Sequence, residues 1–326
     1  MPHIMVTGAN GFIGRALAAR LVTDARFADH RITLTDLRMD APDIAADGRV
    51  HMVAGNLADP AHLARLCQDR VDILFHLAGV LGGAAETEPV LSRRINLDAT
   101  LDLFDRLRSP DTPPRIVLAS SIAVFGPPLP AYIDDDSMPS PTMVYGAHKR
   151  MAEIAMEQQS ARGWIDGIAI RLPGIVARKD ADSRLKSAFL NTLFHDFAAG
   201  RPVSLPVSEH GTSWLISVPA CIDALLHAAT LPPSRLGRRR ALTLPAQCVC
   251  MGDLVAGLRR RFPASPTRIT YQPDPAIEAQ FAAHPPLSTP LGDALGFVHD
   301  GSIDRLIERA LLDSPPLART TAAAAI

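Results

Sequence analysis

Two patterns of apolar residues alternate along the first half of the chain. Short apolar-rich runs, such as HIMVT at 3–7 and RITLTD at 31–36, are followed by stretches in which apolar residues recur every three or four positions. The first pattern is typical of strands buried on both faces, and the second is typical of helices that cover a sheet. We therefore expect an α/β protein with a doubly wound parallel sheet.

The same alternation predicts the later elements. They are a strand and a helix within 50–69, a buried strand at 71–79, an amphipathic helix at 90–108, a strand at 114–126, a helix that begins near Tyr145, and a strand at 167–177. From about residue 180 the rhythm becomes irregular, and prolines concentrate between 263 and 290. We expect 1–178 to form the doubly wound domain and 179–315 to form mainly a smaller lobe, with some segments returning to the sheet. Residues 316–326 are expected to be a disordered tail.

Composition narrows the classes of partner. The net charge of -1 over 326 residues provides no basic field that would attract nucleic acid or an anionic membrane. No apolar stretch approaches the ~20 residues that cross a bilayer, and the first residues do not resemble a signal peptide, so a cytoplasmic protein is expected. The eleven histidines and four cysteines show no metal-ligand spacing, so we expect no metal. Cys248 and Cys250 alternate like inward-facing strand residues and are expected to be reduced thiols.

A glycine motif follows the first expected strand. Gly8, Gly11 and Gly14 lie in TGANGFIG, where the chain turns from strand to helix. Glycine lets a backbone turn sharply and approach a pyrophosphate, and the N-terminus of a helix attracts an anion. Asp36 ends the second strand, where a carboxylate binds an adenosine ribose and repels a 2′-phosphate, which favours NAD over NADP. The structural alternatives are a plain tight turn for the glycines and an ordinary strand-end residue for Asp36. Arg38 lies nearby and leaves NADP as an alternative cofactor.

A tyrosine and a lysine lie one helical turn apart in YGAHK. At this spacing Tyr145 and Lys149 share one helix face, so the ammonium is expected to favour the phenolate and lower the pKa of the tyrosine. A phenolate can remove a proton from a substrate hydroxyl. Ser120 and Ser121 end an apolar strand, where a hydroxyl can stabilise the reacting oxygen. Considered alone, Tyr145 and Lys149 could be an exposed pair on a helix surface. Considered alone, the two serines could be capping or turn residues.

Taken together, these motifs resemble the extended short-chain dehydrogenase/reductase superfamily, which includes the NAD-dependent epimerases and dehydratases. The shared segments are the glycines after Thr7, Asp36, HLAG at 76–79, NLDAT from Asn96, SSIAVFG at 120–126 and YGAHK. The resemblance implies a Rossmann fold, with Ser121 as the polarising hydroxyl, Tyr145 as the acid/base, and Lys149 as its partner and a ligand of the nicotinamide ribose. The NAD-binding residues that it implies are Gly8, Gly11, Phe12, Ile13, Gly14, Asp36, Asn56, Leu57, Leu77, Ala78, Gly79, Asn96, Tyr145, Lys149 and Pro173.

Within the superfamily, RLPGIVAR and GRRRALTLPA look most like the D-erythronate dehydrogenase group, which oxidises a short sugar acid. That likeness implies that Ser121, Tyr145 and Arg178 bind the substrate, with Arg178 at its carboxylate. The following segment KDADSRLKSA is more charged than expected, and Arg184 and Lys186 are either additional carboxylate ligands or a solvated face. Two other functions are possible. One is a nucleotide-sugar epimerase or dehydratase with tightly bound NAD, and the other is an NAD-sensing binding protein. Relatives commonly form homodimers through the helices at 90–108 and after Tyr145, and we expect one here.

Overall fold

A computed structural model describes residues 1–40, 47–178 and 186–312. The chain forms two compact units, each made of three segments of sequence. Unit 1 consists of Met1–Pro173, Val218–Ala246 and Pro285–His299. Unit 2 consists of Gly174–Ser217, Gln247–His284 and Asp300–Ile326.

Unit 1 is built on a seven-stranded sheet in the order β10-β6-β5-β4-β1-β2-β3, in which every neighbouring pair is parallel. The order reverses between β1 and β4, and open sheets of this type bind ligands at the carboxyl ends of strands beside such a switch point. The strands are β1 (His3–Thr7), β2 (Arg31–Asp36), β3 (Val50–Ala54), β4 (Ile73–His76), β5 (Arg115–Ser121), β6 (Asp166–Leu172) and β10 (Ala241–Thr243).

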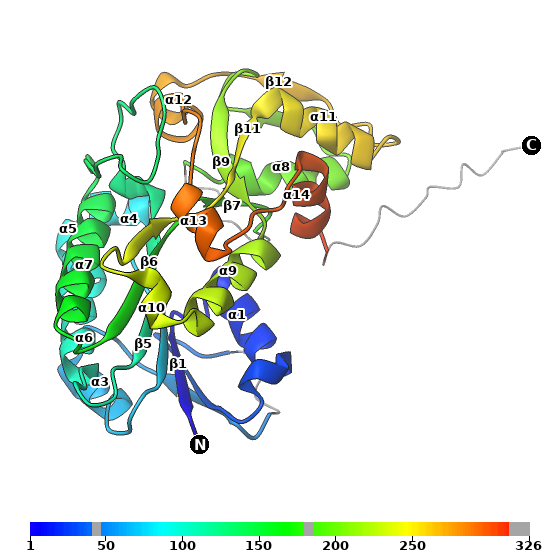
Figure 1. Cartoon of the computed structure of the whole chain (residues 1–326). Coiled ribbons are helices and arrows are strands. Elements are labelled where there is room, and N and C mark those ends of the chain that lie inside the picture. The colour runs from blue at the N-terminus through cyan, green and yellow to red at the C-terminus, as the bar shows by residue number, and fades with distance from the viewer. Residues whose placement is uncertain (41–46, 179–185, 313–326) are drawn as a thin grey trace, which may run out of the picture. The chain divides into compact units, whose positions relative to one another are not determined.

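Helices cover both faces of this sheet (Figure 1). On one side, α7 packs against β5 and β6 and against α6; on the other, α9 packs against β5 and β6 and against α1. The helical elements are α1 (Phe12–Thr23), η1 (Ala25–Phe27), α3 (Pro60–Leu66), α4 (Gly82–Thr87), α5 (Pro89–Arg93), η2 (Arg94–Asp98), α6 (Ala99–Leu107), η3 (Ile122–Val124), α7 (Val144–Ala161), α9 (Val218–Thr230), α10 (Pro233–Leu236) and α13 (Pro290–Leu295). The chain is therefore a doubly wound α/β protein, as the apolar pattern predicts.

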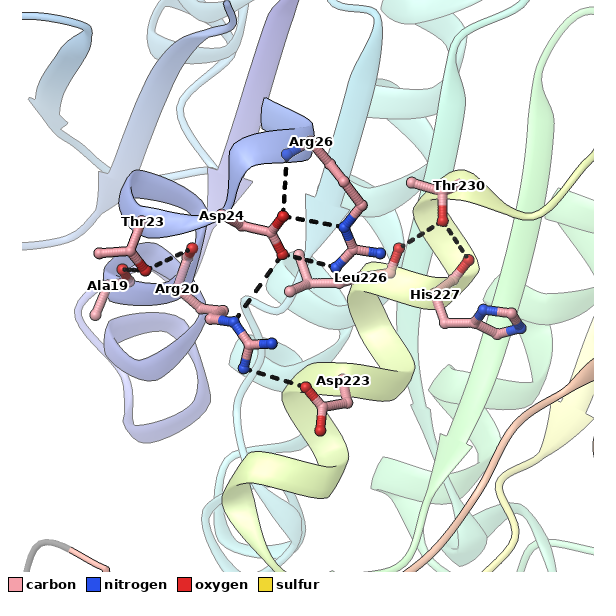
Figure 2. Close-up of polar contacts among 9 residues, drawn as sticks. All are labelled: Ala19, Arg20, Thr23, Asp24, Arg26, Asp223, Leu226, His227 and Thr230. Carbon is pink, nitrogen blue, oxygen red and sulfur yellow. Dashed lines mark hydrogen bonds and ion pairs between the residues drawn. The ribbon is translucent and has the colours of Figure 1, made fainter. Parts of the chain in front are cut away.

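Polar contacts join α9 to α1, although the two helices are about two hundred residues apart in sequence (Figure 2). Arg20 on α1 pairs with Asp223 on α9 at 3.2 Å and lies 4.0 Å from Asp24. Asp24 also accepts hydrogen bonds from the backbone and side chain of Arg26, which lower the pKa of its carboxyl to about 2. These contacts help to hold the returning helix in unit 1.

Unit 2 contains two small sheets and four helices among its described residues. Its apolar core lies around Phe194, Phe197 and Leu215, all at most 1% exposed. The sheets are ordered β11-β9-β7 and β12-β8. The elements are β7 (Gly174–Ile175), α8 (Phe189–Ala198), β8 (Val203–Leu205), β9 (Thr212–Ile216), β11 (Gln247–Cys250), α11 (Met251–Arg261), β12 (Ile269–Tyr271), α12 (Pro275–Phe281) and α14 (Ile303–Ala310).

Several local expectations need correction. The apolar run at 71–79 supplies only the four-residue strand β4, because the chain leaves the sheet after His76. The expected strand at 167–177 is divided between β6 and β7. Cys248 and Cys250 alternate on β11 as expected, but they face away from the core: Cys248 is exposed, whereas Val249 between them is fully buried.

Candidate active site

The glycine turn at the end of β1 is closely packed against the loop that follows β4. Gly8 has a φ of 71°, and a Cβ atom placed on it would lie 2.6 Å from the amide nitrogen of Ala78. A Cβ on Gly14 would lie 2.1 Å from the carbonyl oxygen of Gly8. No side chain caps the N-terminus of α1 at Gly11. This turn has the form of a pyrophosphate cradle, because only glycine fits it and because the first turn of α1, which includes Phe12 and Ile13, presents backbone amides.

Asp36 lies at the carboxyl end of β2, next to the glycine turn. Its carboxylate accepts the backbone N–H of Asn10 at 3.0 Å and that of Leu37 at 2.7 Å, which fixes its orientation. Each oxygen retains a lone pair that can accept a ribose hydroxyl. Arg38, the residue that favours NADP, is exposed.

Asn56 and Leu57 follow β3 at the same edge of the sheet. The Oδ1 atom of Asn56 accepts the N–H of Ala58 at 2.9 Å and closes a turn that leads into α3, while Leu57 is buried in the core. The amide nitrogen of Asn56 adds a donor that an aspartate would lack. The structure thus places an uncharged donor–acceptor pair where the resemblance implies an adenine contact.

Asn96 holds the loop after β4, which contains Leu77, Ala78 and Gly79. Its Oδ1 accepts the N–H of Val80 at 2.7 Å, and its Nδ2 donates to the Val80 carbonyl at 2.9 Å and to the Ser92 hydroxyl at 3.1 Å. Asn96 lies in η2, a π-helical turn that interrupts the expected continuous helix at 90–108. Such turns are frequent at functional sites. The interactions of Asn96 show that it positions this loop.

Ser121, Tyr145 and Lys149 lie close together in unit 1. Ser121 ends β5, and its hydroxyl accepts the backbone N–H of Ala123 at 3.1 Å and acts to lower the pKa of the Tyr145 phenol. Lys149 lies one turn along α7, with its Nζ 5.7 Å from the centre of the Tyr145 ring. The ammonium donates to the carbonyl of Ala119 at 2.8 Å, and the lysine is only 3% exposed. The three predicted catalytic residues are therefore brought together by β5 and α7.

The pKa values of this group differ from the expectation. Burial raises the pKa of the Tyr145 phenol to about 12, and the hydrogen bond from Ser121 opposes the rise only in part. Burial lowers the pKa of Lys149 to about 8, opposed by the negative charge of Glu153. The sequence predicted a lowered pKa for Tyr145, which the chain by itself does not produce because loss of hydration outweighs the other effects.

A buried chain of hydrogen bonds lies under the site. The ring of His76, at the end of β4, contacts the hydroxyl of Thr7 at 2.7 Å and that of Thr100 at 2.8 Å. His148 on α7 contacts Ser92 at 2.9 Å. Both histidines link elements of unit 1, namely β1, β4, α5, α6 and α7, and this role could not be predicted because sequence spacing does not show contacts between elements.

The predicted carboxylate ligand lies in unit 2. Arg178 follows Ala177, which has a φ of 61°, an unusual conformation for a residue that is not glycine. Two residues of α8 hold this turn: Asn191 Oδ1 accepts the Arg178 N–H at 2.9 Å, and His195 Nε2 donates to the Ala177 carbonyl at 2.9 Å. Pro173 ends its segment of unit 1. Arg184 lies outside the described residues, and Lys186 is exposed.

A comparison with protein families decides the kind of protein. Residues 4–235, more than two thirds of the chain, match the NAD dependent epimerase/dehydratase family. The chain belongs to this family. The glycine cradle and Asp36 fit the cofactor in the family's name, since a tight turn that only glycine can form leads directly into the N-terminus of α1, where backbone amides can bind a pyrophosphate.

Two dehydrogenases resemble this chain over nearly its whole length. A D-erythronate dehydrogenase from Cupriavidus necator is 33% identical over 97% of this chain and 100% of its own. A D-erythronate dehydrogenase from Haemophilus influenzae is 29% identical over 94% of this chain and 98% of its own.

Solved structures agree with this assignment. A structure described as a nucleoside-diphosphate-sugar epimerase from Agrobacterium tumefaciens is 32% identical and superposes with a TM-score of 0.88, covering 96% of this chain and 94% of that one. An L-threonine dehydrogenase from Cupriavidus necator has a TM-score of 0.83 at 22% identity over 96% of this chain and 99% of that one, which shows a shared fold. Among the described residues, no helix is both long and apolar enough to span a membrane.

Proposed function

We propose that this protein is an NAD-dependent dehydrogenase that oxidises a hydroxyl carbon of a small sugar acid resembling D-erythronate. The observation that carries the proposal is the arrangement of Ser121, Tyr145 and Lys149 beside the glycine-rich turn of unit 1. Two relatives that are similar over most of the chain are D-erythronate dehydrogenases, which supports a short sugar acid as substrate.

In the proposed mechanism, Tyr145 accepts the proton of the substrate hydroxyl, and Ser121 donates a hydrogen bond to the same oxygen. The phenol needs help to ionise, because burial raises its pKa to about 12. Lys149 supplies a positive charge 5.7 Å from the ring. When bound, NAD provides an oxidised nicotinamide that accepts the hydride and adds a second positive charge. Lys149 holds its position through the Ala119 carbonyl and keeps further N–H donors for a ribose hydroxyl.

We propose that the cofactor is held by the residues around the sheet switch point. Gly8, Gly11 and Gly14 receive the pyrophosphate, Asp36 binds the adenosine ribose, and Asn56 contacts the adenine. The oriented carboxylate of Asp36 supports NAD over NADP, because a 2′-phosphate would bring a second negative charge beside it.

A screen of four- to six-carbon hydroxy acids with NAD tests the proposal. Release of NADH, followed at 340 nm, is expected for at least one sugar acid, and Tyr145→Phe is expected to lower kcat by about 100- to 10,000-fold because it removes the proton acceptor. If wild type forms no NADH with any acid, or if Tyr145→Phe keeps the wild-type rate, the proposal is wrong. An isomerised nucleotide sugar formed without net NADH would identify an epimerase, the function in the description of the Agrobacterium structure.

Arg178 is proposed to bind the substrate carboxylate. The turn at Ala177 and Arg178 is fixed by two side chains of α8, and fixed backbone in a sparsely populated conformation is often found at ligand sites. Arg178→Ala is expected to raise KM for the acid at least tenfold and to leave NAD binding unchanged. Equal KM values for variant and wild type would remove Arg178 from the site.

We also propose a homodimer in the cytoplasm. Four apolar side chains on α5 and α7 are at least 40% exposed, namely Val90, Leu91, Met151 and Ile154, and pairing these helices with a second copy would cover them. Sedimentation of Ile154→Glu is expected to show a monomer. The four free cysteines are consistent with a reducing compartment.

A further inference from the structure

A buried carboxylate occupies the turn of α7 next to Lys149. Glu153 follows Lys149 by four residues, so both lie on the face of the helix that packs on β5 and β6. Glu153 is 0% exposed and Lys149 is 3% exposed. A carboxylate that is withdrawn from water to this extent needs several partners to stay ionised.

The partners of Glu153 come from two neighbouring strands. Ser120, at the end of β5, donates its hydroxyl to Oε1 at 2.5 Å. Arg171, which lies opposite Ser120 in the register of β5 and β6, donates to both carboxylate oxygens at 3.0 and 2.9 Å. Arg150 adds a hydrogen bond at 3.0 Å from the partly exposed edge of the site. The charge of Glu153 is therefore fixed in place by direct contacts that do not include Lys149.

Within the part of the chain that the structure describes, the other side chains that face Lys149 carry no negative charge, and the carbonyl of Ala119, which accepts a hydrogen bond from the ammonium at 2.8 Å, is uncharged. The phenol of Tyr145 lies beside it on α7, and the neutral amide of Asn96 lies near it across Gly79. His76 on β4 would repel the ammonium if it were protonated, and the charge of Lys149 helps to lower the pKa of that imidazole. Glu153, one turn along the same buried face of α7, carries the negative charge that raises the pKa of Lys149.

We propose that Glu153 is a positioning residue for the reaction, a buried counter-charge that keeps Lys149 protonated so that Tyr145 can ionise. Arg171 and Ser120 hold the carboxylate of Glu153 in place. The role in catalysis rests on the proposed function, whereas the effect on Lys149 is a property of the chain alone. Burial works against protonation of Lys149 and Glu153 opposes this effect, so the counter-charge matters most at neutral and mildly alkaline pH.

Direct titration of Lys149 tests the proposal without substrate or cofactor. The sequence contains three lysines, Lys149, Lys179 and Lys186, so NMR of protein with ¹³C-labelled lysine side chains gives few signals, and Lys179→Arg with Lys186→Arg assigns the remaining one. Glu153→Gln is expected to lower the titration midpoint of Lys149 by about one pH unit or more. Glu157→Gln makes the same chemical change two turns along α7 from Lys149 and is expected to leave the midpoint unchanged.

Arg171→Met separates electrostatics from packing. This substitution breaks the ion pair between Arg171 and Glu153 but leaves the negative charge of Glu153. The titration midpoint of Lys149 is therefore expected to stay the same or to rise. If Glu153→Gln does not fold, the double variant Glu153→Gln/Arg171→Met takes its place, because it removes both charges of the ion pair. The titration midpoint of Lys149 is expected to be lower in the double variant than in Arg171→Met alone. An unchanged midpoint in the variant that lacks Glu153, or an equal fall in Arg171→Met, would overturn the proposal.

Kinetics then connect the titration to catalysis. In Glu153→Gln, the limb of the kcat/KM profile at which activity falls with rising pH is expected to move to lower pH together with the NMR midpoint. A parallel loss of activity at every pH would show a structural role only. If wild type has no dehydrogenase activity, the proposed function fails, but the NMR titration still decides whether Glu153 controls Lys149.

Discussion

Replacement of His76 by glutamine is expected to make unit 1 less sensitive to acid. His76 is 1% exposed, and burial, together with the charge of Lys149, lowers the pKa of its imidazole from 6.5 to about 3. The folded protein therefore does not take up this proton in mild acid, whereas the unfolded chain does. The contribution of His76 to the free energy of unfolding is therefore complete above pH 6.5. It is lost as the pH falls from 6.5 toward 3. At about 1.4 kcal/mol per pH unit, wild type should lose about 3 kcal/mol through this group between pH 7.5 and 4.5.

Urea unfolding at pH 7.5 and at pH 4.5 measures this difference. Unit 1 contains Trp164 and unit 2 contains Trp214, so Trp214→Phe as a background lets fluorescence report on unit 1. His76→Gln keeps a donor and an acceptor for Thr7 and Thr100, and its loss of unfolding free energy between the two pH values is expected to be about 3 kcal/mol smaller than that of the parent. His51→Gln, which removes an exposed histidine, is the control. Equal losses of unfolding free energy in His76→Gln and its parent would show that the pKa of His76 is not lowered in the folded protein.

Three further substitutions test the local structure. Asp36→Asn is expected to weaken NAD binding about tenfold and to strengthen NADP binding, as measured by fluorescence titration, since the charge that repels a 2′-phosphate is removed. Gly55→Ala is expected to destabilise the protein by about 1–3 kcal/mol in thermal unfolding, because its Cβ would lie 2.2 Å from Nδ1 of His62. Ala177→Gly is expected to stabilise unit 2 by about 1 kcal/mol in urea unfolding, since glycine adopts the observed φ of 61° without strain.

Local sequence was sufficient to predict β1 to β6, with shorter bounds for β4 to β6, as well as the glycine turn and the strand end and helix face that carry Ser121, Tyr145 and Lys149. These features depend on neighbouring residues: a turn in which a Cβ would collide, a strand end, and two side chains one helical turn apart. The pairing of Glu153 with Arg171 could not be predicted, because it needs the register of β5 against β6 as well as the packing of α7. The direction of the pKa shift of Tyr145 was also wrong, because the degree of burial of a side chain is set by the whole fold.

The catalytic group depends on how the end of β5 meets α7. Three consecutive residues, 119–121, each act on a different turn of the helix: the first holds Lys149 through its carbonyl, the second holds Glu153 through its hydroxyl, and the third lowers the pKa of Tyr145. Successive strand residues point to opposite faces, so a shift of one residue would turn Ser120 away from Glu153 and move the carbonyl that holds Lys149. The geometry of the acid/base group is therefore set by strand register, which the buried pairing of β5 with β4 and β6 fixes.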